Sequence, residues 1–473
     1  MLSRSSFVLI VLLVGCGPSV RDNGSDDDPN APCTPGKVGK CYSGQDGTEG
    51  IGPCHGGMRT CDPGGTWSQC MGEVQPSQEL CGDGVDNNCN GKVDEDEDAD
   101  GDGYTTCGGD CCDSTECSNP ALVNPGAYDA PGNGVDDDCN GVVDDSQAIC
   151  DQNIASGTLN AMDYAKAIDL CQTATMTEKK WGVISATLTL ADGTGAPATI
   201  AQSVRDHFGT GVQPKGGVKM ALFSTGAAAG KGDTNPAYQD FENTPSPTGN
   251  NKQSAFPMDF YVANGNKLPN APGCPAATGT QAFDPVMLTL TIRVPTNAKS
   301  FKLATNFFSS EFPEYTCSPY NDFFVVLLDS AYNGSPANPN DKNLAFYQPS
   351  GSTMKFPVGV NLASGNTGLF TECVNGTTGC AGTAGTISTC TSTSQLLGTG
   401  LDTPTPSQCD ANSLQGGGTG WLETSGNVNP GEIIKLRIAI WDTSDHVLDS
   451  LAVVDGFQWE VDTSQPGTVI FKQ

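Results

Sequence analysis

The sequence predicts a mainly β protein, a jelly-roll-like β-sandwich preceded by a disulfide-rich stalk of calcium loops with little regular secondary structure. Two stretches, 286–294 and 434–441, alternate apolar with polar or mixed residues, which is typical of antiparallel strands packed on one face. Of the 21 cysteines, all but Cys16 lie between positions 33 and 409, a usage typical of exported chains with disulfides. Acidic residues at metal-ligand spacing fill the stretch before the sandwich.

The N-terminus predicts export and a lipid anchor. Arg4 and the apolar run at 7–14 form a signal peptide, because the run is too short to span a bilayer. Positions 13–16 (LVGC) resemble a bacterial lipobox, which implies cleavage before Cys16 and lipidation of its thiol; an ordinary secretory signal is the alternative. Gly17 favours the outer membrane, by resemblance to lipoprotein sorting. We therefore expect a cell-envelope protein that a lipid anchors to the membrane, at the outer membrane or cell surface.

Composition divides the chain into five segments. We expect a signal peptide at 1–15, a flexible tether at 16–32, a cysteine-rich disulfide module at 33–81, acidic metal-binding repeats at 82–149 and the β-sandwich at 150–473. In the last segment, helices are expected at 161–171 and 200–208, and further strands at 181–190, 218–224, 301–309, 323–328 and 451–460. The Gly-, Ser- and Thr-rich stretch 365–418 has four cysteines, which predicts long insertions tied by disulfides.

The cysteines predict how disulfides are distributed but leave their connectivity open. Twelve cysteines lie at 33–139 and eight at 150–409, so each group can pair internally. Cys111 and Cys112 are expected to have different partners, because a bridge between adjacent residues is strained. Zinc binding by thiolates is the alternative, which export and the even count disfavour.

The charge of the chain indicates cation binding and argues against nucleic acid as a partner. The formal net charge is −31, whereas nucleic-acid binding needs a basic surface. Between Gly82 and Cys150 there are 18 acidic residues and one lysine. A solvated acidic face is the alternative, but these carboxylates lie at ligand spacing with glycines between them.

Three runs fit the calcium-loop pattern D-x-[DN]-x-[DN]-G, in which alternate side chains converge on one cation and the glycine allows a sharp turn. The first run fills every ligand position of a twelve-residue loop with Asp86, Asn88, Asn90, the carbonyl of Lys92, Asp94 and Glu97. A near copy supplies Asp136, Asp138, Asn140, the carbonyl of Val142 and Asp144, with the weaker ligand Gln147 at position 12. The middle run supplies Asp98, Asp100, Asp102 and the carbonyl of Tyr104, and borrows Asp110 or Asp113. Flanking helices are not evident, so we expect the affinity of extracellular modules, with a Kd on the order of 10⁻⁴–10⁻³ M for Ca²⁺.

These repeats resemble a known family. The runs at 84–95, 100–104, 124–127 and 136–145 are similar to MopE-type metal-binding repeats, over residues 79–145. That resemblance implies a bound metal ion, and the family's label refers to copper. We expect Ca²⁺ and regard copper as unsuited, because the ligands are hard oxygens and no histidine lies in the segment. Pro131 stands where the first repeat has Cys81, so the second copy cannot repeat the same local cysteine pairing.

The sandwich segment resembles choice-of-anchor L domains. The similarity spans most of 160–460 and rests on the runs at 283–286, 307–315, 320–322, 441–450 and 454–457. It implies a surface domain without an established activity. Acidic residues recur near the predicted strand ends, where they either converge on Ca²⁺ or a hydroxyl-rich ligand or cap turns. They are Glu311, Asp322, Asp445, Asp449 and Asp455.

We expect no enzymatic activity. No nucleophile elbow, zinc-protease or phosphate-loop motif occurs, and the three histidines belong to no ordered constellation. The predicted function is that of a surface lipoprotein in which calcium stiffens the stalk and the sandwich binds a glycan, a matrix component or a surface protein. Two alternatives stay open: an exported polysaccharide hydrolase that uses Glu311 and Glu314 beside a calcium accessory module, and a metal-binding protein that takes copper.

Overall fold

A computed structural model of the chain describes residues 32–94, 98–114, 117–145, 148–241, 250–404, 408–409, 414 and 416–471. The predicted signal peptide, Cys16 and the tether up to residue 31 lie outside these residues, as do Glu97 and Gln147. None of the described helices is long and apolar enough to cross a membrane. The chain divides into two compact units: unit 1 is Met1–Glu97 with Thr105–Gly108, and unit 2 is Asp98–Tyr104 with Gly109–Gln473.

Unit 1 is held together by disulfides more than by an apolar core. Its described residues form one two-stranded antiparallel sheet, β1 (Val38–Cys41) with β2 (Gly57–Thr60), and the 3₁₀ turn η1 (Thr106–Gly108). The buried apolar residues of its described part are Cys54, Cys61 and Cys89. A segment with so small a core depends on cross-links, which are Cys33–Cys61, Cys41–Cys70, Cys54–Cys89 and Cys81–Cys107.

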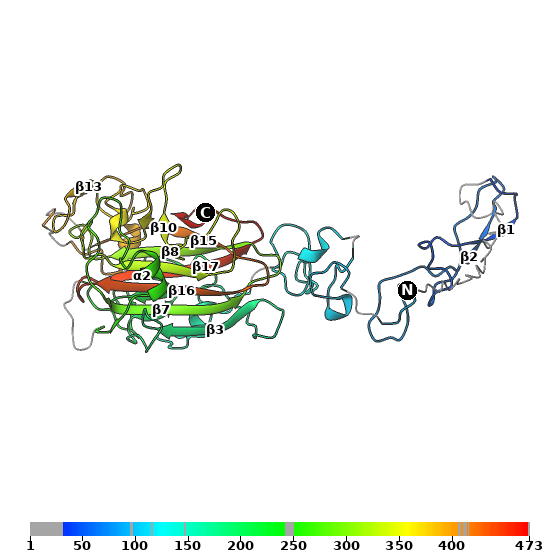
Figure 1. Cartoon of the computed structure of the whole chain (residues 1–473), viewed down its shortest axis with the longest axis horizontal. Helices are drawn as coiled ribbons and strands as arrows, with labels where there is room; N and C mark the ends of the chain where they lie inside the picture. The colour runs from blue at the N-terminus through cyan, green and yellow to red at the C-terminus, as the bar shows by residue number, and fades with distance from the viewer. Residues whose placement is uncertain are drawn as a thin grey trace, which may run out of the picture. The chain divides into compact units, whose positions relative to one another are not determined.

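Unit 2 is built around two antiparallel sheets, whose long strands lie side by side in Figure 1. The larger sheet has the order β18 (Gly467–Ile470), β15 (Leu422–Asn427), β8 (Ser300–Ser309), β17 (Ser450–Glu460), β5 (Met220–Ser224) and β4 (Gln202–Arg205), with β14 (Gly417–Gly418) beside β8. The smaller sheet has the order β3 (Gly182–Thr189), β7 (Ala282–Arg293), β16 (Ile433–Thr443) and β9 (Phe323–Asp329), with β6 (Gln253–Ser254) beside β7. From β7 to β9 and again from β15 to β17, successive strands alternate between the sheets, as in a jelly-roll-like sandwich. The predicted mainly β sandwich is confirmed.

The main core lies between the two sheets. The inward side chains of β7 are Val286, Leu288, Leu290 and Ile292, and those of β16 are Ile434, Leu436, Ile438 and Ile440; all of them have 0% exposure. The alternation of apolar residues in the sequence corresponds to this face. The opposite sheet contributes Phe301, Leu303 and Phe307 of β8, Ala452 and Val454 of β17, and Ala221 and Phe223 of β5.

The outer faces of both sheets are partly covered, which explains why β8 and β9 are buried on nearly every residue. Helix α2 (Met258–Ala263) packs Phe260 against Trp441 and Phe323 on the outside of the smaller sheet. Phe208, Leu396 and Leu401 cover Phe308 and Leu451 on the outside of the larger sheet. Because apolar residues stand on both faces of β9, its sequence is a continuous apolar run (FFVVLL), whereas β8 has buried polar residues, such as Thr305 and Asn306, among its apolar ones.

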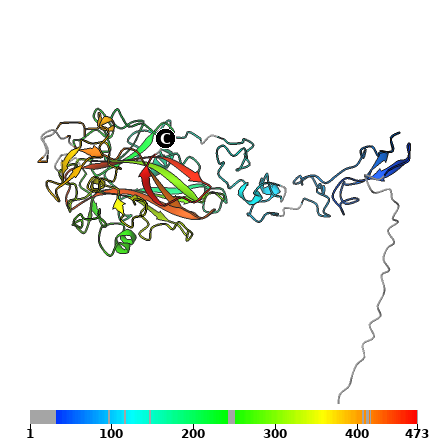
Figure 2. The ribbon, with the colours of Figure 1, turned by 90° about the horizontal axis from the view of Figure 1, so that it is seen from above.

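The remaining elements of the described chain are short. Helix α1 (Ala161–Lys166) is capped at its N-terminus by Asn160. Two small hairpins pair β10 (Phe346–Tyr347) with β11 (Phe356–Pro357) and β12 (Gly376–Thr378) with β13 (Gly385–Ile387). Single 3₁₀ turns are η2 (Pro120–Leu122), η3 (Val360–Leu362) and η4 (Ser394–Leu396). The described part of the stretch 365–418, yellow to orange, lies at one end of the strands (Figures 1 and 2) and contains Cys373–Cys390 and Cys380–Cys409.

The helix expected at 200–208 is wrong, since this stretch contains strand β4, paired with β5. Ile200, Val204 and Phe208 have a helical spacing, but Ser203 and Arg205 between them are buried and bonded to neighbouring segments. Ser203 Oγ donates to the carbonyl of Ala228 at 2.6 Å, and Arg205 forms an ion pair with Asp233 at 3.1 Å. Tertiary partners therefore outweigh the local pattern. The helix expected at 161–171 forms only as α1, over its first six residues.

The disulfides follow the predicted distribution. Within the first group, Cys111 pairs with Cys139 and Cys112 with Cys117, in addition to the four bonds of unit 1. The adjacent cysteines thus have separate partners, as expected. The second group forms Cys150–Cys171 and Cys274–Cys317 besides the two bonds of the insertion. The predicted domain boundaries stay predictions; Cys54–Cys89 and Cys81–Cys107 reach across the one placed after Cys81.

Candidate metal centre

The three predicted calcium loops share one pattern of side-chain to backbone hydrogen bonds. In each loop the carboxylate at position 1 accepts hydrogen bonds from the amides of positions 5 and 6, at 2.8 to 3.2 Å. The side chain at position 3 accepts the amide of position 5, and that at position 5 accepts the amide of position 7. The glycine at position 6 has a φ of +95°, +94° or +92°, which other residues rarely adopt; it is Gly91, Gly103 or Gly141. The sequence spacing therefore corresponds to a turn in which the side chains of positions 1, 3 and 5 lie close together.

The first and third loops are copies at an offset of 50 residues, and the structure adds one acidic residue to each. Glu79, 7% exposed, accepts the amide of Asn88 at 3.1 Å, and Asp129, 5% exposed, accepts the amide of Asp137 at 3.1 Å. Neither residue was among the predicted ligands. The 50-residue offset is the sequence signal that could have paired them, since Asp86 and Asp136 have the same separation.

Asp94 and Asp144, the predicted ligands at position 9, bond to the turn that precedes their loops. Asp94 Oδ1 accepts the amide of Gly82 at 2.9 Å, and Asp144 Oδ1 accepts the amide of Gly132 at 2.7 Å. Both residues have a positive φ, +51° and +52°. These carboxylates therefore stabilise the start of each repeat. The predicted position-12 residues Glu97 and Gln147 lie outside the described residues.

The middle loop gathers the carboxylates that the sequence pattern suggested. Within the described part of the chain, two sets of three carboxylates have ligand oxygens that all lie within 4.8 Å of one another. One set is Asp98, Asp100 and Asp113, and the other is Asp100, Asp102 and Asp110. Asp110 and Asp113 are the two residues that the irregular loop was expected to borrow, and Asp100 belongs to both sets.

Burial leaves part of this cluster without hydrogen-bond donors. Asp110 is 2% exposed, and its Oδ2, like Oδ2 of Asp100, is buried and has no hydrogen-bond partner. Burial raises the pKa of Asp110 to about 6, and the charges of Asp102, Asp100 and Asp113 act in the same direction. Burial also raises the pKa of Asp100. Buried carboxylate oxygens that point at one another without donors are a fit for a hard divalent cation.

Neighbouring residues hold the cluster in place. Asp110 Oδ1 accepts the amide of Cys112 at 2.8 Å, next to the bonds Cys111–Cys139 and Cys112–Cys117. Asn124 Nδ2 donates to Asp102 Oδ2 at 2.7 Å, and the amide of Ala99 donates to Asp113 Oδ1 at 2.6 Å. The site is thus assembled from the loop itself and from a disulfide-bonded segment that follows it.

The acidic residues predicted at a sandwich edge fall into two places. Glu311, Asp322, Asp445 and Asp449 influence one another electrostatically at one end of the strands. Asp442 and Asp284, which were not predicted, belong to the same group. Asp455 lies elsewhere: its Oδ2 accepts the amides of Lys215 and Gly216, and the charge of Asp169 helps burial to raise its pKa.

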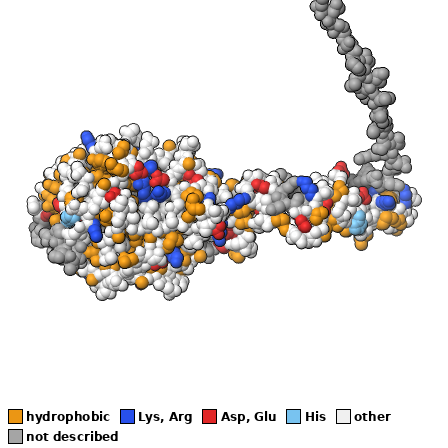
Figure 3. All heavy atoms as spheres, turned by 60° about the horizontal axis from the view of Figure 1, so that its bottom comes forward, with side chains coloured by type: hydrophobic (Ala, Val, Ile, Leu, Met, Phe, Trp, Pro, Cys, Tyr) orange, Lys and Arg blue, Asp and Glu red, His pale blue; other side chains and the backbone are white. Residues whose placement is uncertain are grey.

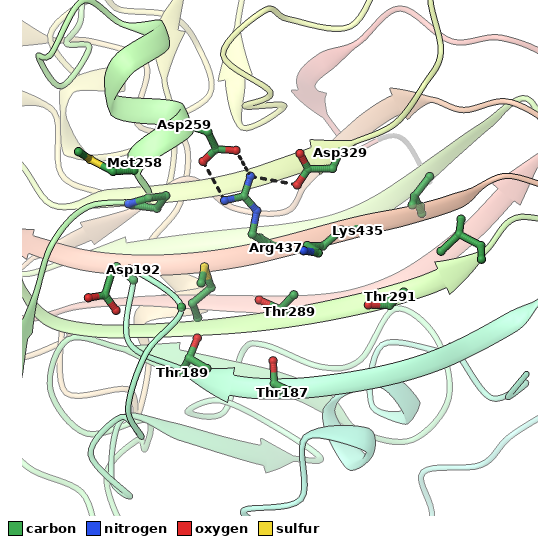
Figure 4. Close-up of a pocket in the computed structure, with 16 residues that line it drawn as sticks. Thr187, Thr189, Asp192, Met258, Asp259, Thr289, Thr291, Asp329, Lys435 and Arg437 are labelled. Atoms are coloured by element: carbon green, nitrogen blue, oxygen red, sulfur yellow. Dashed lines mark hydrogen bonds and ion pairs between the residues drawn. The ribbon is translucent and has the colours of Figure 1, made fainter. Parts of the chain in front are cut away.

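A second candidate site is an open cleft of about 860 Å³ on the outside of the smaller sheet. Figure 4 shows Thr187 and Thr189 on one strand and Thr289 and Thr291 on the next, below Arg437. Arg437 bonds to Asp259 of α2 at 2.6 Å and to Asp329 of β9 at 3.1 Å, which fixes the guanidinium at the cleft. Figure 3 shows adjoining acidic and basic side chains among polar ones on the surface of this unit. The cleft is lined by hydroxyls and ion pairs together with apolar side chains such as Met258 and Met287.

Comparison with known families identifies the repeats. Residues 74–95 and 118–145 match a family model named Cu-binding MopE and described as "Putative metal-binding motif". The two matched stretches contain the loops that begin at Asp86 and Asp136, and the middle loop with the two carboxylate sets lies between them. No curated protein and no solved structure matches the chain. The chain therefore carries a metal-binding motif in two copies, in a disulfide-rich segment that precedes a β-sandwich.

Proposed function

We propose that this protein is a non-enzymatic, calcium-binding lipoprotein of the cell surface. Ca²⁺ binds in the repeats and stabilises them, the lipid on Cys16 anchors the chain, and the sandwich binds a partner. The observation that carries the proposal is the carboxylate set Asp100, Asp102 and Asp110, in which two buried oxygens have no hydrogen-bond donor. A hard dication supplies the charge that these oxygens lack.

The donor set favours Ca²⁺ over copper and zinc. Every candidate side-chain ligand in the three loops offers oxygen, and no histidine lies between Glu79 and Asp145. The cysteines of that stretch are all bonded in disulfides, which removes the thiolates that zinc or copper would use. These residues therefore do not favour copper, the metal to which the name of the matched family refers.

The cleft on the smaller sheet supports the binding half of the proposal. Its hydroxyls and ion pairs suit a partner rich in hydroxyl groups, such as a glycan, and the Oγ1 of Thr189 and Nε of Arg437 are buried without hydrogen-bond partners. The hydrolase alternative finds no such support. Glu311 is 3% exposed and accepts the amide of Asp322 at 3.3 Å, while Glu314 Oε1 accepts the amide of Gln408 at 2.7 Å.

Metal content and titration test the metal half. The protein, purified under mildly oxidising conditions, is analysed for bound elements and titrated calorimetrically with Ca²⁺ and with Cu²⁺. We expect Ca²⁺ binding that Asp100→Asn weakens by about tenfold, because Asp100 belongs to both carboxylate sets. Asp462→Asn is the matched control, since Asp462 is exposed and far from these sets in the sequence. Stoichiometric copper with no calcium would overturn the proposal.

Two further measurements test the anchor and the partner. Cys16→Ser is expected to release the protein from the membrane fraction. Thr289→Arg, which places a long charged side chain in the cleft, is expected to abolish retention on an immobilised glycan panel, whereas the control Thr463→Arg on an exposed loop retains it. Hydrolysis of any glycan of the panel by the wild-type protein would contradict the non-enzymatic assignment.

A further inference from the structure

The acidic residues at one end of the sandwich lie where both sheets terminate. In the larger sheet, Ser309 at the end of β8 pairs with Ser450 at the start of β17. In the smaller sheet, Trp441 near the end of β16 pairs with Phe323 at the start of β9. Glu311, Asp322, Asp442 and Asp449 follow or precede these four positions by one or two residues, so the four strand ends bring them together.

This group is buried far more deeply than a solvated acidic surface. Asp322 is 0% exposed, Glu311 3% and Asp442 4%, while Asp449 is partly buried. Its hydrogen bonds use few of the available oxygens: Glu311 accepts the amide of Asp322 at 3.3 Å, and Asp449 accepts the hydroxyl of Thr225 at 3.4 Å. An ionised carboxylate in such a place is strongly unfavourable unless it is paired or hydrogen-bonded.

Asp322 has neither kind of compensation. Both of its carboxylate oxygens are buried and have no hydrogen-bond partner. The carboxyl group of Asp442 and the hydroxyl of Ser450 lie beside it and act to lower its pKa, and Ser450 Oγ is itself buried. Three oxygen-bearing side chains therefore meet at one buried point.

Among the described residues, no cationic side chain is among the dominant charged neighbours of this point. Burial, followed by other carboxylates, raises the pKa of Glu311 and of Asp442, and the charges acting on Asp322 come from Asp445 and Asp284. The one nearby histidine, His446, is hydrogen-bonded at 2.6 Å to Asp284 and has that carboxylate as its partner.

The backbone of β16 directs Asp442 to this position. Its register with β7 shifts between Ile440 and Asp442, which marks a β-bulge. The extra residue of this bulge lies on β7, where Val286 and Phe283 are three residues apart, whereas Ile440 and Asp442 are two residues apart. Asp442 therefore continues the regular alternation of β16 and follows Ile438 and Ile440 on the face between the sheets.

We propose that a divalent cation, Ca²⁺ by the hardness of the oxygens, binds inside this end of the sandwich between Asp322 and Asp442, with Ser450 Oγ as a third ligand and Glu311 next to it. This site differs from the carboxylate sets of the repeats, because it has two carboxylates and a hydroxyl and lies between two sheets. It does not depend on calcium binding in the repeats. The ion joins β9 and β16 of one sheet to β17 of the other, so it closes the open end of the sandwich.

Local hydrogen exchange on the full mature chain tests the site. At a free Ca²⁺ concentration of about 100 times Kd, mass action predicts that exchange at 321–324 and 449–452 slows by about 100-fold relative to protein in EGTA. Asp322→Asn is expected to abolish this slowing, and Asp462→Asn is expected to leave it intact. Asp100→Asn, which removes a ligand from the repeats, is expected to leave the slowing at 321–324 and 449–452 intact as well. Loss of Ca²⁺ binding in the repeats and loss of Ca²⁺ binding at this site therefore change exchange at different amides.

Tb³⁺ luminescence gives a second readout that does not depend on the variant folding well. Trp441 precedes Asp442, so selective excitation of tryptophan is expected to sensitise Tb³⁺ in wild-type protein, and Ca²⁺ is expected to displace it. Trp441→Phe removes the donor and should remove the signal. Protection at 321–324, taken relative to the intrinsic exchange rate at each pH, that ignores Ca²⁺ but rises on acidification would overturn the proposal, because protons and not a cation would then neutralise the group.

Discussion

Replacing Asp110 by asparagine is expected to change local stability in opposite directions with and without Ca²⁺. Asp110 is 2% exposed in a cluster of carboxylates, and burial raises its pKa from 3.8 to about 6. Each pKa unit corresponds to about 1.4 kcal/mol, so ionised Asp110 destabilises the metal-free loop by at most about 3 kcal/mol, and by less where water screens the cluster. Asparagine removes that charge and relieves the penalty.

With Ca²⁺ bound, the same substitution removes a ligand. At about 100 times Kd, binding to the native state stabilises it by about 2.7 kcal/mol. The variant is expected to gain less than about 1 kcal/mol at the same concentration, because the number of charged ligands sets calcium affinity in such loops. In Ca²⁺ the loop of the wild-type protein is therefore more stable than that of the variant. In EGTA the loop of the variant is at least as stable as that of the wild type.

Hydrogen exchange measures both effects locally. The amides of Gly101, Asp102, Gly103 and Tyr104 bond to the carboxylates of this loop, so their opening free energies report its stability. Asp462→Asn serves as a control for the loss of one negative charge. If Asp110→Asn and Asp462→Asn respond equally to Ca²⁺, or if the variant is the less stable one in EGTA, the assignment of Asp110 as a buried ligand is wrong.

Three further predictions concern the sandwich. Ile438→Ala, at a position with 0% exposure, should cost about 2–5 kcal/mol in denaturant unfolding, and a loss below about 1 kcal/mol would contradict close packing between the sheets. Replacing Cys274 and Cys317 together by serine should lower the free energy of unfolding by about 2–5 kcal/mol. A reducing agent should cause no further loss through this bond in the double variant, because the bond is already absent. Burial raises the pKa of Asp455 to about 8 and that of Asp169 to about 7. Because the folded state then binds protons more tightly than the unfolded state, stability is greatest below about pH 4 for these groups and falls as the pH rises towards 8, and Asp455→Asn should flatten the profile by roughly 2–4 kcal/mol in the free energy of unfolding, measured by urea titrations across that range.

The strands of the sandwich could be predicted because their side chains follow the burial of the sheet. At 286–294 and 434–441, one face meets the main core and the other meets polar surroundings or a thin cover, so the period of two survives in the sequence. At 200–208 the apolar residues Ile200, Val204 and Phe208 are spaced four positions apart, as in a helix, although the stretch contains a strand. The partners that settle β4, such as Asp233 for Arg205, come from distant segments that no local window contains.

In the metal loops, too, contacts within a few residues could be predicted from the sequence, whereas contacts between distant segments could not. Positions 1, 3, 5 and 6 of each loop are fixed by spacing, because their hydrogen bonds close within a few residues. The convergence of Asp110 on Asp100 depends on the segment that Cys111 and Cys112 hold, and cysteine connectivity cannot be derived from sequence. Asp442 was missed for a related reason: its neighbour Asp322 directly precedes β9, and only the pairing register places the start of β9 beside the end of β16.

The 50-residue copies are connected to the rest of the chain through different cysteines. Cys89 and Cys139 occupy the same position in their loops, yet Cys89 pairs with Cys54 and Cys139 pairs with Cys111. The hydrogen bonds that shape each loop are the same in both, so the loop does not require a particular partner for its cysteine. Such a loop is a local structural unit that a duplication can insert or a deletion can remove, because its cysteine can form a disulfide with different partner cysteines. The length of chain between the N-terminus and the sandwich can then change in evolution by the gain or loss of whole loop repeats, without a change to the sandwich.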